Sequence, residues 1–241
     1  MLKNHHLNKN NQKEQCKKAL FLFNLCVTII VRMFRIDKSC KKEEEFVRII
    51  DISQEVLSCN VYPGDPSPKG EKIKSMEQGE IYNLSVFSMC AHNGTHIDAP
   101  SHFIKDGKTV DEIPVGSTVG CCYVAHHKGD VTAEDATFIL EKASSLNAGE
   151  RILISGDATV TEEAAEIFAK AGLKLLGNEG QTVGPKDAPM KVHQILLGVG
   201  IVLLEGIVLQ NVSEGKYFLS AAPLNLKGFE GSPCRAYLIE E

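Results

Sequence analysis

The sequence predicts an α/β domain that is rich in strands and has few helices. Short apolar runs recur along the chain between turn residues, and only two segments open with a clear helix-start signal. An apolar strand directly follows each of those helices, which is the succession typical of an α/β unit. Hydrophobic residues make up 43% and charged residues 24% of the 241 residues, and this ordinary globular usage excludes a disordered chain and a polytopic membrane protein.

The domain is expected to span residues 47–241, with its first strand at residues 49–53. Two prolines and a glycine then fall within residues 62–66, and a loop is predicted there because these residue types interrupt both strands and helices. Further apolar runs predict strands at residues 81–89 and 121–126. The first half of the domain is therefore expected to consist of strands and loops.

Two helices are predicted in the middle of the chain. Thr132, with Asp135 three residues later, is expected to cap the first helix, which fades before residue 149. Thr159 and Glu162 have the spacing of a capping box for the second helix. An apolar face with helical spacing follows and is expected to end at Gly172.

Apolar runs in the second half of the domain predict five more strands and one more helix. The strands are expected at residues 152–155, 173–176, 201–205, 217–221 and 235–239. The helix is expected at residues 190–197. Together with the earlier runs, these elements make a strand-rich α/β domain.

Residues 1–46 differ in composition from the rest of the chain and are expected to form an amino-terminal extension. An apolar run at residues 19–31 lies between a polar and a charged stretch, and it is shorter than the roughly 20 residues that span a bilayer. No small-residue cleavage site follows it. We expect a flexible, dispensable extension or a misassigned start, and the alternative is a weak membrane-anchoring or targeting segment.

Charge and cysteine usage narrow the classes of partner. The formal net charge is −5, from 26 Lys and Arg against 31 Asp and Glu, and this disfavours a general nucleic-acid binder, which gathers basic residues against phosphate. The eight cysteines include no C-x-x-C pair, so neither a zinc ribbon nor a redox motif is predicted. We expect reduced thiols, a cytoplasmic location, and no nucleic-acid or membrane partner.

The residues that can carry chemistry concentrate in residues 91–103. Three histidines and an aspartate stand there at positions of one parity: His92, His96, Asp98 and His102. A glycine and a proline within the segment disfavour a helix, so an extended or turning backbone is expected, and in an extended chain these side chains project to one side. Two imidazoles and a carboxylate that converge suit Zn, Mn or Fe(II), with a position left for water. The alternative is a polar turn in which the histidines bond only to backbone groups.

The segment reads H-x-G-T-H-x-D-x-P-x-H and resembles the signature of the cyclase family of metal-dependent hydrolases, which contains bacterial kynurenine formamidase and isatin hydrolase. The resemblance extends over roughly residues 48–240. Residues 51–53 and 62–66 are similar to the family's opening, and residues 173–185 are similar to its central strand and loop. The resemblance implies a swivelling β/β/α domain that assembles as a homodimer or homotetramer.

The resemblance also implies which side chains hold metal. His92, His96 and Asp98 would hold one ion, and Asp98, His193 and Glu205 would complete a second site in members with two ions. Zinc is the first expectation and manganese the second, with one or two ions in each site. The expected cofactor is therefore a divalent metal.

The second pair of ligands also has a physical argument of its own. His193 lies in the helix predicted at residues 190–197, and Glu205 ends an apolar strand, where burying an unpaired carboxylate is costly. A bound cation removes that cost. The alternative is a strand end at which the Glu205 side chain reaches solvent.

The activity that the resemblance implies is hydrolysis of a C–N amide bond of a small molecule by metal-activated water, in the manner of an arylformamidase of tryptophan catabolism. His102 would be the acid/base residue that moves a proton to the leaving nitrogen. Tyr62, Phe87 and Phe103 are candidates to contact an aryl ring. Two alternatives stay open: a hydrolase that opens a cyclic amide or lactone, and a non-catalytic metal-binding module, against which the additional imidazole of His102 argues.

Overall fold

The computed structural model describes residues 47–240. The expectations for residues 1–46 lie outside this range. Within it, no helix combines the length and the apolar character that crossing a membrane requires.

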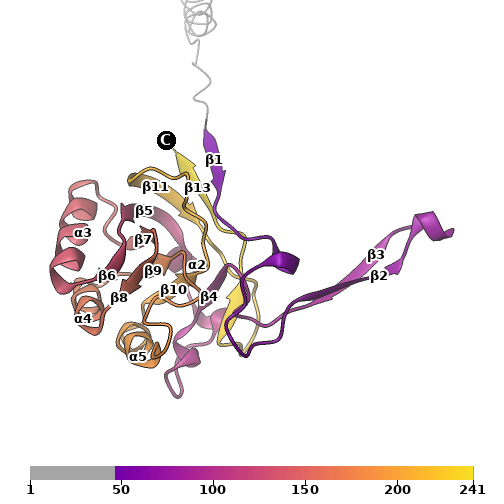
Figure 1. The fold of residues 1–241 in the computed structure, drawn as a ribbon, viewed down its shortest axis with the longest axis horizontal. Helices are drawn as coiled ribbons and strands as arrows, with labels where there is room; N and C mark the ends of the chain where they lie inside the picture. Colours follow the sequence, from indigo (N-terminus) through magenta and orange to yellow (C-terminus); the bar gives the residue numbers. More distant parts are fainter. Residues whose placement is uncertain (1–46, 241) are drawn as a thin grey trace, which may run out of the picture. The chain divides into compact units, whose positions relative to one another are not determined.

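A nine-stranded sheet forms the body of the domain (Figure 1). Its strands are β1 (Arg48–Asp51), β4 (His96–Asp98), β5 (Val119–His126), β7 (Arg151–Ser155), β9 (Leu175–Asn178), β10 (Val202–Glu205), β11 (Gly215–Ser220), β12 (Gly231–Pro233) and β13 (Tyr237–Glu240). Their order across the sheet is β1-β13-β11-β5-β7-β9-β10-β4-β12. The central strands β5, β7, β9 and β10 run parallel to their neighbours within that group, and the flanking strands pair antiparallel.

The longer helices α3 (Ala133–Ser145), α4 (Glu162–Ala171) and α5 (Met190–Gly198) cover one face of this sheet (Figure 1). A single-turn helix, α2 (Val115–Thr118), leads into β5. Strand residues alternate between the two faces, so Ile152 and Ile154 pack against the helices while Leu153 packs in the cluster on the other face. Both faces of the central strands are largely buried, and this explains why their sequences are apolar over most of their length, with polar residues mainly at the strand ends.

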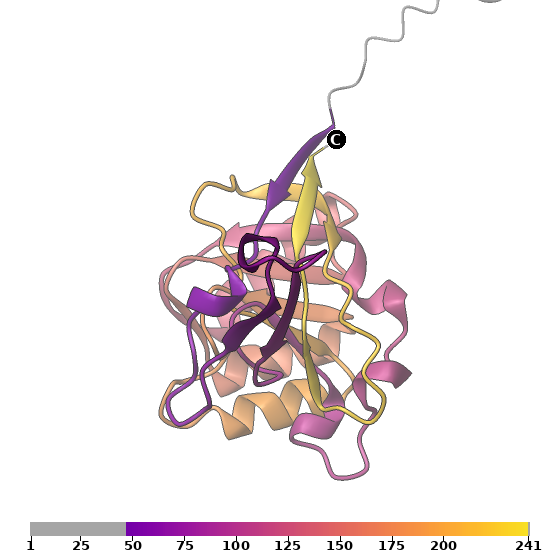
Figure 2. The same ribbon diagram turned by 90° about the vertical axis from the view of Figure 1, so that its right-hand side faces the viewer.

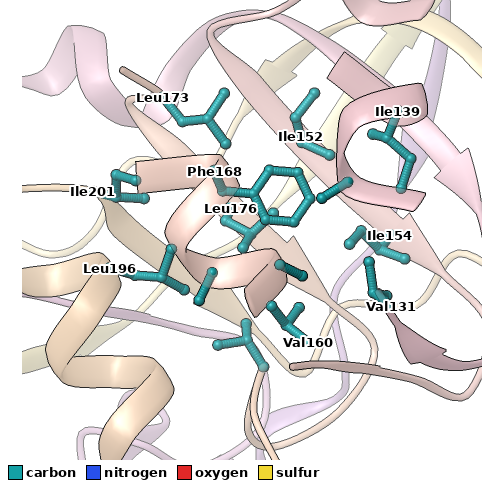
Figure 3. Packing of buried hydrophobic residues seen from close by; sticks show 14 of the residues in the cluster. Val131, Ile139, Ile152, Ile154, Val160, Phe168, Leu173, Leu176, Leu196 and Ile201 are labelled. Atoms are coloured by element: carbon teal, nitrogen blue, oxygen red, sulfur yellow. The ribbon is translucent and has the colours of Figure 1, made fainter. Parts of the chain in front are cut away.

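Phe168 of α4 lies at the centre of the helix-side core (Figure 3). Its ring is fully buried, with Ile152 and Leu176 of the sheet and Leu173 beside it. Truncating such a side chain to alanine costs about 3–5 kcal/mol. This core holds the helix layer, including α5, against the sheet.

Smaller elements complete the described range. The hairpin strands β2 (Lys69–Lys74) and β3 (Leu84–Ser88) form one two-stranded sheet, and β6 (Gly129–Val131) pairs with β8 (Ala158–Val160) in another. The β2–β3 hairpin runs outward from the nine-stranded sheet, and Figure 2 looks along it. Single 3₁₀ turns occur at Val56–Ser58, Met76–Gln78, Pro100–His102 and Val110–Glu112.

The strand-rich α/β class predicted from the sequence is confirmed, but one helix start is wrong. Thr132 and Asp135 form the predicted capping box of α3. Thr159, however, lies in β8, where it pairs with Asp130, and the cap of α4 is Thr161. Both threonines precede acidic residues, and strand pairing decides between them because it removes Thr159 from the helix.

The end of α4 is where the sequence places it, since Gly172 follows the helix in the left-handed conformation at φ 72°. The predicted strand at 81–89 is shorter, because β3 covers only Leu84–Ser88. Neither β4 nor β12 was predicted as a separate strand, since three residues show too little periodicity to be recognised. These two strands lie beside the candidate site.

Candidate metal centre

The candidate site lies where β4, β10 and α5 meet, on the helix-covered face of the sheet. The antiparallel register of β4 and β10 sets His96 opposite Glu205 and Asp98 opposite Leu203. Directly opposed residues project to the same face, and Leu203 belongs to the helix-side core. Strand pairing therefore brings one imidazole and two carboxylates together on that face.

The helix α5 adds His193 to this group. Its Nε2 lies 3.2 Å from Oε1 of Glu205 and 3.6 Å from Oδ2 of Asp98. The backbone N–H of Val183 also donates to Oε1 of Glu205, at 2.8 Å, and so fixes that carboxylate. The four side chains of His96, Asp98, His193 and Glu205 belong to residues that are at most 3% exposed.

Backbone carbonyls set the tautomers of the two buried histidines. Nδ1 of His96 lies 2.9 Å from the carbonyl of Gly94, and Nδ1 of His193 lies 2.8 Å from the carbonyl of Pro189. A carbonyl can only accept, so each Nδ1 carries a proton and each Nε2 faces the carboxylates. Nε2 of His96 lies 3.4 and 3.5 Å from their nearest oxygens.

The remaining positions of the motif shape the chain around these ligands. Gly94 has φ 62°, and a Cβ there would lie 2.7 Å from the Cβ of Cys59, so only glycine fits. The hydroxyl of Thr95 donates to the carbonyl of Gly206, which directly follows β10, at 2.6 Å. Pro100 begins the 3₁₀ turn that carries His102. Glycine, threonine and proline therefore have structural roles here.

His92 and His102 reach the same place from outside strand β4. Nδ1 of His92 lies 2.8 Å from Oδ1 of Asp98, and the rings of His92 and His102 stack with their centroids 4.1 Å apart. The segment has the expected extended or turning backbone, with His96 and Asp98 in β4, His92 in a turn and His102 in the 3₁₀ turn. The shared parity of an extended chain therefore applies only to His96 and Asp98. His92 and His102 come close to them because the chain turns on either side of β4.

Two overlapping groups of candidate ligands result, and Asp98 belongs to both. Within each group the donor atoms lie within 4.8 Å of one another. One group is His92, His96 and Asp98, and the other is Asp98, His193 and Glu205. The structure thus brings together the five side chains that the sequence nominates as ligands, with His102 beside them.

The donor set fits a divalent cation. Oδ2 of Asp98 is buried and has no hydrogen-bond partner among residues 47–240, which is costly for a carboxylate oxygen unless a cation lies nearby. No lysine or arginine occurs among the described residues that line the adjoining cavity. Imidazole nitrogen and carboxylate oxygen together suit zinc and similar divalent ions.

The electrostatics of the cluster show the same need for positive charge. Burial disfavours a charged His96, but Asp98 and Glu205 outweigh this and raise the pKa of His96 to about 10. Burial likewise opposes the carboxylate form of Asp98, but its hydrogen bonds to His92 and His96 hold its pKa well below the usual range. The imidazoles therefore supply the countercharge that a bound cation would supply in their place.

His102 differs from the other three histidines of the cluster. Burial is the largest influence on it, and the pKa of His102 is lowered from its usual value. The pKa values of His92 and His193 are raised, because their carboxylate partners overcome the effect of burial. His102 is thus the imidazole that stays neutral at neutral pH and can accept a proton.

A cavity of about 310 Å³ opens onto the cluster. His92, His96, His102, His193 and Glu205 all line it. Two of the three aromatic residues nominated to contact an aryl ring, Tyr62 and Phe103, line it as well. Phe87 does not, since it lies on β3 with 63% of its surface exposed.

Cys90 and Gln181 also line the cavity, and sequence reasoning did not single them out. Neither belongs to a recognisable pattern, so no signal in the sequence points to them. The adjacent histidines His126 and His127 line a different depression, in which Nε2 of His126 bonds to the carbonyl of Val212 at 2.8 Å.

Comparison with known proteins places this chain among related sequences. Residues 50–185 match the family described as "Putative cyclase". The chain is 32% identical over 204 residues to kynurenine formamidase of Salinibacter ruber, across 79% of this chain and 96% of that protein. It is 34% identical over 204 residues to kynurenine formamidase of Bacillus cytotoxicus, across 78% of this chain and 96% of that protein.

Solved structures agree with the sequence relatives. A potential metal-dependent hydrolase with cyclase activity superposes with a TM-score of 0.67 at 26% identity, covering 81% of this chain and 98% of that one. Isatin hydrolase A of Labrenzia aggregata shares the fold, with a TM-score of 0.67 at 24% identity over 80% of this chain and 93% of that one. With its metal-ligand motif, its sequence relatives and its fold in agreement, this chain belongs to the cyclase family.

Proposed function

We propose that the protein is a metal-dependent hydrolase that cleaves a C–N amide bond of a small molecule, with aryl formamides as the substrate class. The observation that carries the proposal is the cluster itself: two buried carboxylates and three candidate ligand imidazoles meet beside a cavity, and Oδ2 of Asp98 accepts no hydrogen bond from the described residues. The relatives named kynurenine formamidase support the choice of substrate class.

In this proposal His92, His96 and Asp98 hold one ion, and Asp98, His193 and Glu205 hold a second. Zinc is the first choice and manganese the second, because imidazole and carboxylate ligands suit both. When bound, such an ion lowers the pKa of water and polarises a carbonyl oxygen. Asp98 belongs to both groups, so its loss would affect both sites.

His102 is proposed as the acid/base residue. It lines the cavity, stacks on His92 and is neutral at neutral pH because burial lowers its pKa. It accepts a proton from the attacking water and returns it to the leaving nitrogen, which then departs as a neutral amine. The ring of Phe103 packs edge-on against His102 at 4.4 Å and limits its rotation.

The cavity supports a small substrate with one ring. Its volume of about 310 Å³ is at the lower end of the range for small-molecule sites. Tyr62, Phe103 and Pro189 supply apolar surface in the lining of the cavity. An aryl group placed against them leaves its amide directed to the cluster.

We also propose that the protein is cytoplasmic and forms a homodimer, with a homotetramer as the alternative. The hairpin supports the assembly, because large apolar side chains along it lie in the open: Ile73, Met76, Ile81, Val86 and Phe87. Ile81 alone is 91% exposed. Several large apolar side chains exposed on one hairpin favour a contact with another protein surface, and we propose a second copy of this chain as the partner.

A substrate panel tests the proposed activity. Metal-free protein is reloaded with Zn²⁺ or Mn²⁺ and offered aryl formamides, cyclic amides and lactones. Hydrolysis of the formamides alone is the expected result. Exclusive opening of the rings would make the protein a ring-opening hydrolase instead, and full metal loading without any turnover would make it a metal-binding module.

A further inference from the structure

The carboxyl-terminal segment at Glu230 and Gly231 forms the outer wall of the metal centre, beyond the five candidate ligands. Strand β12 pairs antiparallel with β4, so Gly231 stands opposite Asp98. The carbonyl of Glu230 accepts from the backbone N–H of Ala99 at 2.8 Å. Both residues are therefore held against the motif, although they lie outside the matched family region, residues 50–185.

Gly231 has no side chain, and the imidazole ring of His92 occupies the space that a side chain at this position would fill. A Cβ on Gly231 would lie 2.5 Å from Cε1 and 2.9 Å from Nε2 of His92, closer than such contacts occur. Gly231 is not among the glycines with positive φ, so close approach explains the glycine and backbone conformation does not. The imidazole of His92 packs against the bare backbone of β12.

Glu230 lies beside Nε2 of the same imidazole, whereas Asp98 lies beside Nδ1. Its Oε1 is 3.3 Å from Nε2 of His92, while Nδ1 of His92 is 2.8 Å from Oδ1 of Asp98. An ion held by both Asp98 and His92 would therefore be bound through Nδ1 of His92, which would leave Nε2 to carry the proton and donate to Glu230. This is the reverse of His96 and His193, which have Nδ1 on backbone carbonyls and Nε2 directed inward.

We propose that Glu230 is a positioning residue that orients His92 to bind metal through Nδ1, with Gly231 providing the space for the ring. Carboxylates in this relation to a ligand histidine fix its tautomer and raise its basicity. Because His102 stacks on His92, the same contact also sets the position of the acid/base residue. The inference rests on the metal assignment in the proposed function but not on the substrate.

Metal binding by the full chain tests this inference. Metal-free wild type and the variants Glu230→Gln and Glu230→Ala are titrated with Co²⁺ against a chelator, and the visible absorption of the bound Co²⁺ is recorded. Glu230→Ala is expected to weaken binding at the His92 site by about 10- to 100-fold and to change its spectrum. Glu230→Gln, which retains an acceptor, is expected to lose less.

Two controls separate positioning from general damage. Glu166→Gln removes an exposed carboxylate that pairs with Lys170 at 3.6 Å on α4, and it should leave Co²⁺ affinity and spectrum unchanged. Gly231→Ala displaces the His92 ring, and it should remove the His92 site while Asp98, His193 and Glu205 still bind one ion. That variant provides the test if Glu230→Ala does not fold.

¹⁵N NMR of the Zn²⁺-loaded protein shows directly which ring nitrogen of each histidine carries the proton. With ¹⁵N-labelled histidine, His92 should carry its proton on Nε2, whereas His96 and His193 should carry theirs on Nδ1. Wild-type affinity in Glu230→Ala, or Nδ1–H on His92, would overturn the inference while leaving the hydrolase intact. If the variants change Co²⁺ binding as expected but the wild type hydrolyses no amide, only the proposed substrate class is overturned. If the wild type binds no ion, both proposals are overturned.

Discussion

The metal cluster and the β2–β3 hairpin depart from ordinary protein structure in opposite directions. The cluster buries two carboxylates, with Asp98 1% exposed, whereas the hairpin leaves Ile81 91% exposed. Folded proteins normally place charged groups outside and large apolar groups inside. Within residues 47–240, each region therefore lacks a partner: a cation for the buried carboxylates and an apolar surface for the exposed hairpin side chains.

The shared carboxylate is the strongest test of the buried region. Asp98→Asn removes the charge common to both candidate ion sites while keeping the shape of the side chain. Turnover of an aryl formamide is expected to fall by roughly 10³-fold or more, because the charge stabilisation at the reacting carbonyl is lost with the ions. Elemental analysis should show less than one ion per chain, and two firmly bound ions in this variant would break the proposed ligand assignment.

The acid/base residue is expected to give the next largest effect. His102→Asn should lower turnover by about 10²- to 10⁴-fold, because the proton for the leaving nitrogen loses its carrier. The ions should stay bound, since His102 is in neither ligand group. Steady-state kinetics and metal content are measured on the same sample, and turnover near that of the wild type would remove His102 from the mechanism.

Removing metal should reduce stability, since Asp98 and Glu205 then rely on imidazolium groups alone. A ligand at 100 times its Kd stabilises the folded state by about 2.7 kcal/mol. For a domain of this size that corresponds to a fall in Tm of roughly 5–10 °C on chelation. Thermal unfolding with and without chelator measures it, and equal Tm values would mean that the buried carboxylates do not depend on a cation.

The hairpin should respond to substitution in assembly but hardly in fold. Ile81→Lys is expected to shift the solution mass toward the monomer, because it places charge in the proposed contact, while changing the stability of the subunit by about 0.5 kcal/mol or less. Val115→Lys is the matched control, since Val115 is a 64% exposed apolar residue on α2 and not on the hairpin. Light scattering after gel filtration reads the mass, and an unchanged oligomer in Ile81→Lys would exclude the hairpin tip from the contact.

The predicted helices show what local sequence patterns can and cannot predict about where a helix begins. Thr132 and Asp135 cap α3 as expected, because a capping box needs only residues three apart. Thr159 has an equally good local pattern, but it lies in β8 because Asp130 of β6 pairs with it. A partner almost thirty residues away is invisible to a local rule.

In the candidate site, too, some features follow from local sequence and others depend on long-range pairing. The spacing of His92, His96, Asp98 and His102 nominates them, and the apolar run that ends in Glu205 nominates a carboxylate that needs a partner. That His96 stands opposite Glu205 depends on strand register, which no single segment contains. Glu230 has no signal in the sequence at all, because its role comes only from the pairing of β12 with β4.

By itself the sequence determined the α/β class and showed which imidazoles and carboxylates are candidate ligands, because periodicity and side-chain type are local properties. The roles proposed for these ligands and for His102 come from the resemblance to the cyclase family. Tertiary structure decided which nitrogen of each histidine faces the carboxylates, which residues close the cavity and which residue supports His92 from behind. Those features depend on the order of strands in the sheet and on the placement of α5 over it. These features affect stability and chemistry because the carboxylates are buried, and a carboxylate removed from water needs a countercharge within a few ångströms.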